Sequence, residues 1–66
     1  MILTLNGKQE SIEKPVTLER LIAAKGLCPD KIVVEYNFSI ISKEDLPKIT
    51  LKDQDMIEII SFVGGG

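Results

Sequence analysis

Histidine and tryptophan are missing from this 66-residue sequence, and cysteine occurs once, as Cys28. A single cysteine excludes an internal disulfide framework, and without histidine it also argues against a zinc site. The same shortage leaves almost no material for a nucleophilic catalytic triad. We therefore expect no metal site, no bound cofactor and no catalytic residue. A small binding or carrier module is favoured over a self-sufficient enzyme.

The sequence also lacks an excess of basic residues and a long apolar run. Its 8 basic and 10 acidic residues give a net charge of −2, whereas nucleic-acid-binding domains are usually basic. No apolar run approaches the ~20 residues that cross a bilayer. The first residues, Met1 to Leu5, carry no basic segment typical of a signal peptide. We expect a cytoplasmic protein with neither a nucleic-acid nor a membrane partner.

Hydrophobic residues make up 44% of the chain, enough for the core of one small domain. Asn6-Gly7 is a strong signal for a tight hairpin between an alternating strand that ends at Leu5 and a return strand over 8–13. A two-residue turn places Lys8 opposite Leu5, on the same face of the hairpin. A charged residue on the face of an apolar one indicates either a bulge in the hairpin or an edge strand. The sequence leaves these two alternatives open.

A short helix is predicted after Pro15. Thr17 is a suitable N-cap, and Gly26 is a natural residue to follow the helix end. The apolar positions between them, at i, i+3 and i+4, form a stripe that must pack on a sheet. These positions are Leu18, Leu21 and Ile22.

Three further strands are predicted over 31–37, 40–42 and 56–63, with a single helical turn over 43–47. The order hairpin, helix, strands specifies an α+β, β-grasp (ubiquitin-like) fold, a mixed sheet of about five strands crossed by one α-helix. The first and last strands are expected side by side in the middle of the sheet. The domain is predicted to span residues 1–63, followed by a flexible glycine tail over 64–66.

Alternation assigns the two faces of the last strand. Glu58 marks the solvent face, which leaves Ile57 and Ile59 toward the core. Ile60 and Phe62 then lie on the solvent face near the tail, and Val33 joins them from the neighbouring strand. Exposed apolar side chains that cluster on one face often mark a partner site. We predict docking through Ile60, Phe62, Val33 and Glu58.

The last three residues, Gly64, Gly65 and Gly66, fit neither a strand nor a turn. Glycine has no Cβ, so its backbone can pass through a narrow channel. No side chain shields the carboxyl carbon of Gly66 from attack. These properties suit a carboxylate that another protein activates, and the frayed terminus of an ordinary domain is the alternative.

A β-grasp domain with this tail resembles the ThiS family, the sulfur carriers of thiamine thiazole synthesis. The similarity covers the whole chain: Leu5-Asn6-Gly7, Val16-Thr17-Leu18 to Leu21, Val34-Glu35-Tyr36-Asn37, and Asp55 to Ile59 leading into the terminal glycines. Two turns depart from the expected pattern. Phe38 follows Asn37, and Gln54 precedes Asp55, where glycine or a similar turn-forming residue is expected.

The resemblance implies a sequence of partners. An E1-like adenylyltransferase of the ThiF type would use ATP to adenylate Gly66. A cysteine desulfurase or sulfurtransferase would supply sulfur to form a thiocarboxylate. A thiazole synthase of the ThiG type would then receive that sulfur. The chain itself would be a co-substrate, with Gly64 and Gly65 extending its reach.

Three other interpretations remain open. The small subunit of molybdopterin synthase and a ubiquitin-like protein modifier share this fold and tail. A β-grasp binding module with inert glycines belongs to another class. Cys28 is most simply an inert thiol. Asp53 and Asp55 are more simply turn residues than ligands of a cation, because a cation needs more spaced oxygens.

Overall fold

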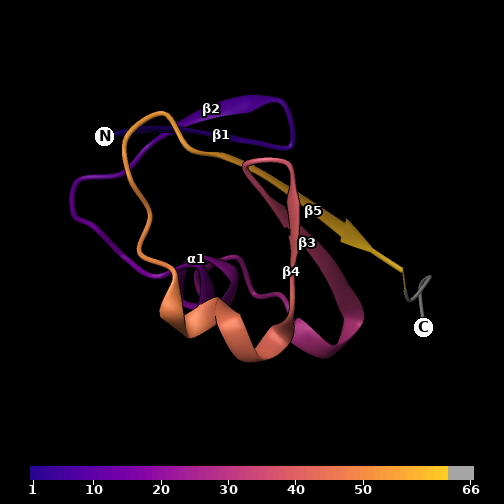
Figure 1. The fold of residues 1–66 in the computed structure, drawn as a ribbon. Helices are drawn as coiled ribbons and strands as arrows, with labels where there is room; N and C mark the ends of the chain where they lie inside the picture. The colour runs from indigo at the N-terminus through magenta and orange to yellow at the C-terminus, as the bar shows by residue number, and fades with distance from the viewer. Residues whose placement is uncertain (63–66) are drawn as a thin grey trace.

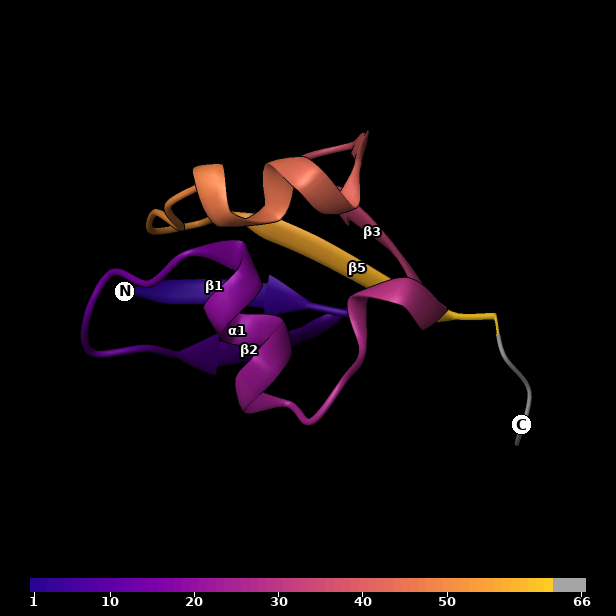
Figure 2. The same cartoon turned by 90° about the horizontal axis from the view of Figure 1, so that it is seen from below.

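The computed structural model describes residues 1–62, which form a five-stranded mixed sheet with helices on one face (Figures 1 and 2). The strands are β1 (Ile2–Leu5), β2 (Lys8–Ser11), β3 (Ile32–Tyr36), β4 (Ser39–Ile41) and β5 (Met56–Ser61). The helices are α1 (Leu18–Ala24) and two 3-10 segments, η1 (Pro29–Lys31) and η2 (Lys43–Lys48). The predicted order of the strands and of α1 is confirmed, and η1 is a 3-10 segment that the sequence did not lead us to expect. Strands β2, β3 and β5 and helix α1 are shorter than predicted, and β4 begins and ends one residue earlier.

The strand order is β2-β1-β5-β3-β4. The first and last strands run side by side in parallel, with Thr4 opposite Met56, and the other neighbouring pairs are antiparallel. This is the β-grasp arrangement predicted from the sequence. The predicted boundary between a domain over 1–63 and a tail over 64–66 lies outside the described residues.

The first hairpin resolves the question of its register. Asn6 and Gly7 have φ values of 50° and 81°, the positive values that a type I′ turn requires. Lys8 lies opposite Leu5 and Glu10 opposite Leu3, without a bulge. Of the two alternatives, the edge strand is correct, since β2 has a neighbour on one side only. At the edge, Glu10 reaches the Lys25 ammonium, 2.7 Å away, at the end of α1.

Helix α1 begins as predicted. The Thr17 hydroxyl accepts a hydrogen bond of 3.1 Å from the Arg20 main-chain N–H, and Gly26 follows the helix end with a φ of 73°. The start of α1 is tied to the segment after η2, because the Leu18 N–H donates to the Ile49 carbonyl over 2.9 Å. This hydrogen bond links α1 to the end of η2, and these two helical segments lie on the same face of the sheet, as Figure 2 shows.

The core lies between that face and the helices. Alternation in β5 is confirmed, since Ile57 is fully buried and Ile59 packs against the core from its edge. The buried apolar side chains come from three strands, from α1, from η2 and from the segment before β5. They are Leu3, Leu5, Leu18, Leu21, Ile22, Ile32, Val34, Leu46, Leu51 and Ile57.

Two turns at the same end of the sheet adopt left-handed conformations. Phe38, in the β3–β4 turn, and Gln54, before β5, both have a φ of 72°. These are the two positions at which the sequence pattern led us to expect glycine. Neither departure changes the course of the chain, although each places an L residue where glycine is less strained.

Candidate functional site

Strand β5 carries the described chain toward its terminal glycines. Its first half is paired on both sides, and the side-chain oxygen of Asn6 accepts a hydrogen bond of 2.7 Å from the Ile59 N–H. Beyond that point only β3 and η1 support it. Ile60 lies opposite Val33, and the Phe62 N–H donates to the Lys31 carbonyl over 3.3 Å. The described chain therefore leaves the sheet next to η1. Gly64, Gly65 and Gly66 lie outside the described residues.

The sheet face turned away from α1 carries three of the four predicted docking residues, Val33, Glu58 and Ile60, whereas Phe62 follows the end of β5. Val33 and Ile60 are opposite each other, as are Glu35 and Glu58, and Ile40 lies opposite Glu35 on the other side. Residues in such register share one face. We call this surface the open face and define it as Val33, Glu35, Ile40, Glu58 and Ile60.

Apolar exposure among residues 1–62 is concentrated on the open face and its borders. Ile60 is 59% exposed and Ile40 71% exposed. The other exposed large apolar side chains are Phe62, Met56 and Phe38, at the two ends of β5 and at the β3–β4 turn. Exposed apolar side chains gathered in this way often mark a partner surface. The docking role of Ile60, Phe62, Val33 and Glu58 stays a prediction.

Sequence reasoning missed Ile40 and Phe38 as part of this apolar region. A signal was available, because a two-residue turn at 37–38 places Ile40 opposite Glu35, and Glu35 lies two residues from Val33 and so shares its predicted solvent face. The register confirms that geometry. The apolar region is therefore wider than the last strand and its immediate neighbour.

The buried carboxylate of Asp55 was also not anticipated. It is 4% exposed and accepts hydrogen bonds from the Tyr36 hydroxyl at 2.7 Å, the Lys52 N–H at 2.7 Å and the Asn37 amide at 3.1 Å. Asp53 accepts a hydrogen bond of 2.6 Å from the Ile2 N–H. Both carboxylates therefore accept hydrogen bonds that hold the turn before β5 in place. This favours the interpretation of Asp53 and Asp55 as turn residues over a cation site.

The described residues offer little material for catalysis or metal binding. Within residues 1–62, no group of three or more Cys, Asp or Glu side chains is placed to hold a metal ion. Cys28 is exposed and precedes η1. Its chemical role stays a prediction.

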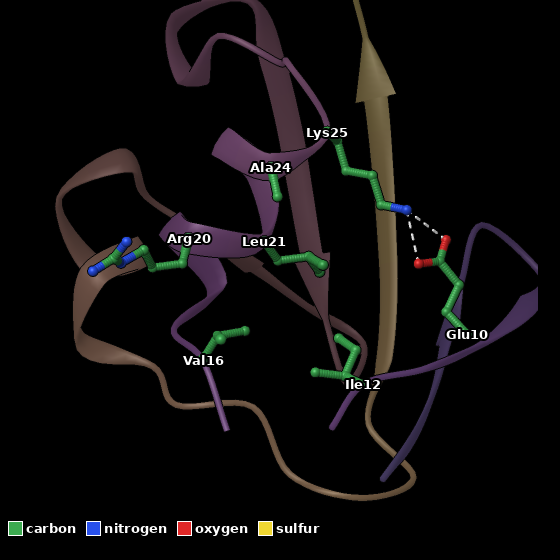
Figure 3. A pocket seen from close by; sticks show the side chains of 7 residues that line it. All are labelled: Glu10, Ile12, Val16, Arg20, Leu21, Ala24 and Lys25. Carbon is green, nitrogen blue, oxygen red and sulfur yellow. Dashed lines mark hydrogen bonds and ion pairs between the residues drawn. The ribbon is translucent and has the colours of Figure 1, made fainter. Parts of the chain in front are cut away.

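A cavity of about 310 Å³ lies between α1 and β2, on the helix side of the sheet (Figure 3). Its walls are mostly apolar, and the Lys25–Glu10 ion pair borders one side, with two short contacts of 2.7 and 2.8 Å. The remaining lining residues are Ile12, Val16, Arg20, Leu21 and Ala24. The cavity is on the opposite face of the sheet from the open face and takes no part in the candidate site.

None of the helices in the described part of the chain combines the length and apolar character needed to cross a membrane. The location of the protein stays a prediction.

Comparison with known proteins gives consistent matches. A sequence model of the ThiS family matches residues 3–66. The chain is 42% identical to the sulfur carrier protein ThiS of Bacillus subtilis, an alignment that covers 98% of this chain and 100% of that protein. Its fold is similar to the crystal structure of the thiamine biosynthesis protein (ThiS) from Geobacter metallireducens. That similarity has a TM-score of 0.84 and 30% sequence identity, with complete coverage of both chains.

Longer proteins match as well. The chain is 36% identical over its full length to a thiazole synthase of Magnetococcus marinus. It spans 20% of the length of this protein and of a second thiazole synthase, from Paramagnetospirillum magneticum, so most of each of these two proteins has no counterpart in this sequence.

Proposed function

Because the chain belongs to the ThiS family, we propose that it carries sulfur for thiamine biosynthesis as a thiocarboxylate on Gly66. The observation that carries this proposal is the 42% identity to the Bacillus subtilis sulfur carrier over the whole length of that protein. The family match also runs through residue 66 and so includes the three terminal glycines. In this role the chain is a co-substrate and performs no catalysis of its own.

The proposed chemistry takes place on the Gly66 carboxylate and uses the catalytic groups of other proteins. In an E1-like adenylyltransferase of the ThiF type, a carboxylate oxygen attacks the α-phosphate of ATP and pyrophosphate leaves. The resulting acyl-adenylate has an electrophilic carbonyl carbon. A persulfide sulfur supplied by a cysteine desulfurase or sulfurtransferase attacks that carbon and AMP leaves. A thiol then attacks the donor cysteine sulfur of this acyl disulfide, forms a new disulfide with it and releases the thiocarboxylate.

The proposed acceptor of the sulfur is a thiazole synthase of the ThiG type. Support comes from the two thiazole synthases that contain a region similar to this chain over a fifth of their length. A ThiS-like region therefore occurs within the same polypeptide as a thiazole synthase. This favours thiazole synthesis over the molybdopterin pathway and over protein modification.

The described residues have a docking role in this proposal. The adenylyltransferase and the synthase would recognise the exposed apolar side chains of Ile60 and Phe62 together with the half-buried Val33, with Glu58 beside them. These residues lie at or near the end of β5, which leads to the glycines. An enzyme that grips this surface is placed to receive the terminal carboxylate.

Intact-mass measurement tests the proposal. The protein is incubated with a purified ThiF-type adenylyltransferase, ATP and a cysteine desulfurase with cysteine. The expected result is a mass increase equal to the exchange of one oxygen for one sulfur, and none when ATP is omitted. Ladders of conjugates to other proteins would favour the modifier instead. An unchanged mass with an adenylyltransferase that loads the Bacillus subtilis carrier would overturn the proposal.

A further inference from the structure

Two carboxylates face each other at the centre of the open face. Glu35 on β3 and Glu58 on β5 are directly opposite in the antiparallel register. Like charges in such cross-strand pairs destabilise a sheet. Neither side chain takes part in the three ion pairs found among residues 1–62. Their mutual repulsion is therefore not offset by a cation of the described chain at ion-pair distance.

The surroundings of this pair are apolar on the β4 side and toward the end of β5, while the polar side chain of Asn6 borders it on the β1 side. Ile60 and Val33 form the next outward-facing cross-strand pair toward the end of β5, and Ile40 lies opposite Glu35 on β4. Ile40 and Ile60 are both more than half exposed. The two carboxylates thus lie within an apolar region that is not covered by α1 or η2.

The position of the carboxylates restricts which partner can cover the region. A protein surface that buries Ile60 and Ile40 must also remove water from Glu35 and Glu58, which lie between them. Burying a charge without a counter-charge is strongly unfavourable. An apolar surface alone would therefore be rejected, and the partner must bring a cation. Arginine suits the position, because its planar group carries five donors and can serve two carboxylates at once.

We propose that the open face binds a protein surface on which an arginine, surrounded by apolar side chains, inserts between Glu35 and Glu58. The inference rests on the proposed function, in that the occupant is the adenylating enzyme that receives the terminal carboxylate. The apolar contacts supply most of the buried interface area, and the arginine makes the interface specific for this partner. The carboxylate pair rejects surfaces that are only hydrophobic.

A charge-matched pair of variants tests the inference. The first carries Glu35→Gln and Glu58→Gln. The control carries Glu13→Gln and Glu19→Gln, which remove the same charge from exposed positions in the loop before α1 and on α1 itself. Binding to a purified ThiF-type adenylyltransferase is measured by calorimetry at low and high salt. Unfolding of each free protein in urea is measured in parallel.

The expected result is a dissociation constant raised about thirtyfold or more by the open-face variant, since the partner's arginine is left buried and unpaired. Its salt dependence should fall, and its loading with sulfur should recover at saturating enzyme. The free variant should be as stable as the unmodified protein or more so, because repulsion is removed. The control should bind normally.

Equal affinities for the two variants would overturn the inference, whether both are unchanged or both are weakened by charge alone. A destabilised open-face variant would also contradict it. If the unmodified protein gains sulfur while the open-face variant binds equally well, the docking inference is wrong and the proposed function stands. If the unmodified protein neither binds nor gains sulfur, both are wrong.

Discussion

The hydroxyl of Tyr36 donates a hydrogen bond of 2.7 Å to the Asp55 carboxylate, and this bond ties the end of β3 to the residue before β5. Burial raises the pKa of Asp55, but the hydrogen bonds from Tyr36, Lys52 and Asn37 outweigh it and bring the pKa below its usual value. The carboxylate therefore stays ionised inside the fold. It holds the left-handed β3–β4 turn against the strand that leads to the glycines.

Replacing Asp55 with Asn should lower the free energy of unfolding by about 2–3 kcal/mol, because a buried network loses an acceptor and leaves donors unpaired. The contribution of a carboxylate with a lowered pKa is present above its unfolded pKa and is lost as the pH falls through the folded value. The difference between the two proteins should thus shrink on acidification. Urea unfolding over a series of acidic pH values measures this.

The control is Asp45→Asn, which alters an exposed contact of 3.5 Å with Lys48. It should change stability by less than about 0.5 kcal/mol. If Asp55→Asn lowers the free energy of unfolding by no more than Asp45→Asn does, the central role of the buried carboxylate is contradicted.

Tyr36 should titrate unusually late. Burial, followed by the hydrogen bond to Asp55 and its negative charge, raises the pKa of Tyr36 to about 12. A group whose pKa is raised on folding contributes stability that is fully present below its pKa in the unfolded chain. This contribution is lost as the pH rises through its pKa in the folded protein. The stability advantage over Tyr36→Phe should therefore fall by up to about 2 kcal/mol between about pH 10 and pH 12.

The measurement is direct because Tyr36 is the only tyrosine and the chain has no tryptophan. The ultraviolet absorbance of tyrosinate therefore reports this one group. A midpoint near the ordinary value of about 10 in the folded protein would show that the hydrogen bond to Asp55 is not maintained in solution.

Phe38→Gly and Gln54→Gly should each stabilise the protein by about 1 kcal/mol, because both residues have left-handed φ values that cost an L residue energy. Phe38 is 77% exposed and so loses little burial. Ser39→Gly, in the extended strand β4, is the control and should destabilise. Chemical denaturation measures all three. A loss of stability in both turn variants would refute the strain argument.

Deleting Gly66 should abolish sulfur loading while the circular dichroism spectrum and the unfolding midpoint stay unchanged. One residue spans at most about 3.5 Å, so the shortened chain would present its carboxylate short of the α-phosphate of ATP. Intact mass after incubation with the adenylyltransferase and sulfur donor measures the effect. Sulfur loading of the truncated chain at the normal rate would place the chemistry elsewhere.

Ile60→Ser should weaken docking without affecting the fold, because Ile60 is 59% exposed and contributes little to the core. We expect the KM for the adenylyltransferase to rise about tenfold with kcat unchanged, as for a central apolar contact. Ala23→Ser, on the exposed side of α1, is the matched control. An equal KM for the two variants would exclude Ile60 from the docking surface.

Much of this fold could be predicted from signals that span a few residues. The dipeptide Asn6-Gly7 specified the first hairpin, Thr17 the start of α1, and alternation around Glu58 the two faces of β5. Each signal arises from backbone conformation or side-chain period, which neighbouring residues set on their own. The same local reasoning placed Ile60 and Val33 on the solvent face.

The amino-acid sequence was enough to predict the order of the elements and the faces of the strands, and it shows the three terminal glycines directly. The burial of Asp55 beside Tyr36 and the opposition of Glu35 and Glu58 became visible only in the folded structure. These relationships join residues from different strands, so they depend on register and strand order. A tight turn sets the register of its own hairpin, but the register between strands that are distant in the sequence, such as β3 and β5, is fixed only when the whole core packs.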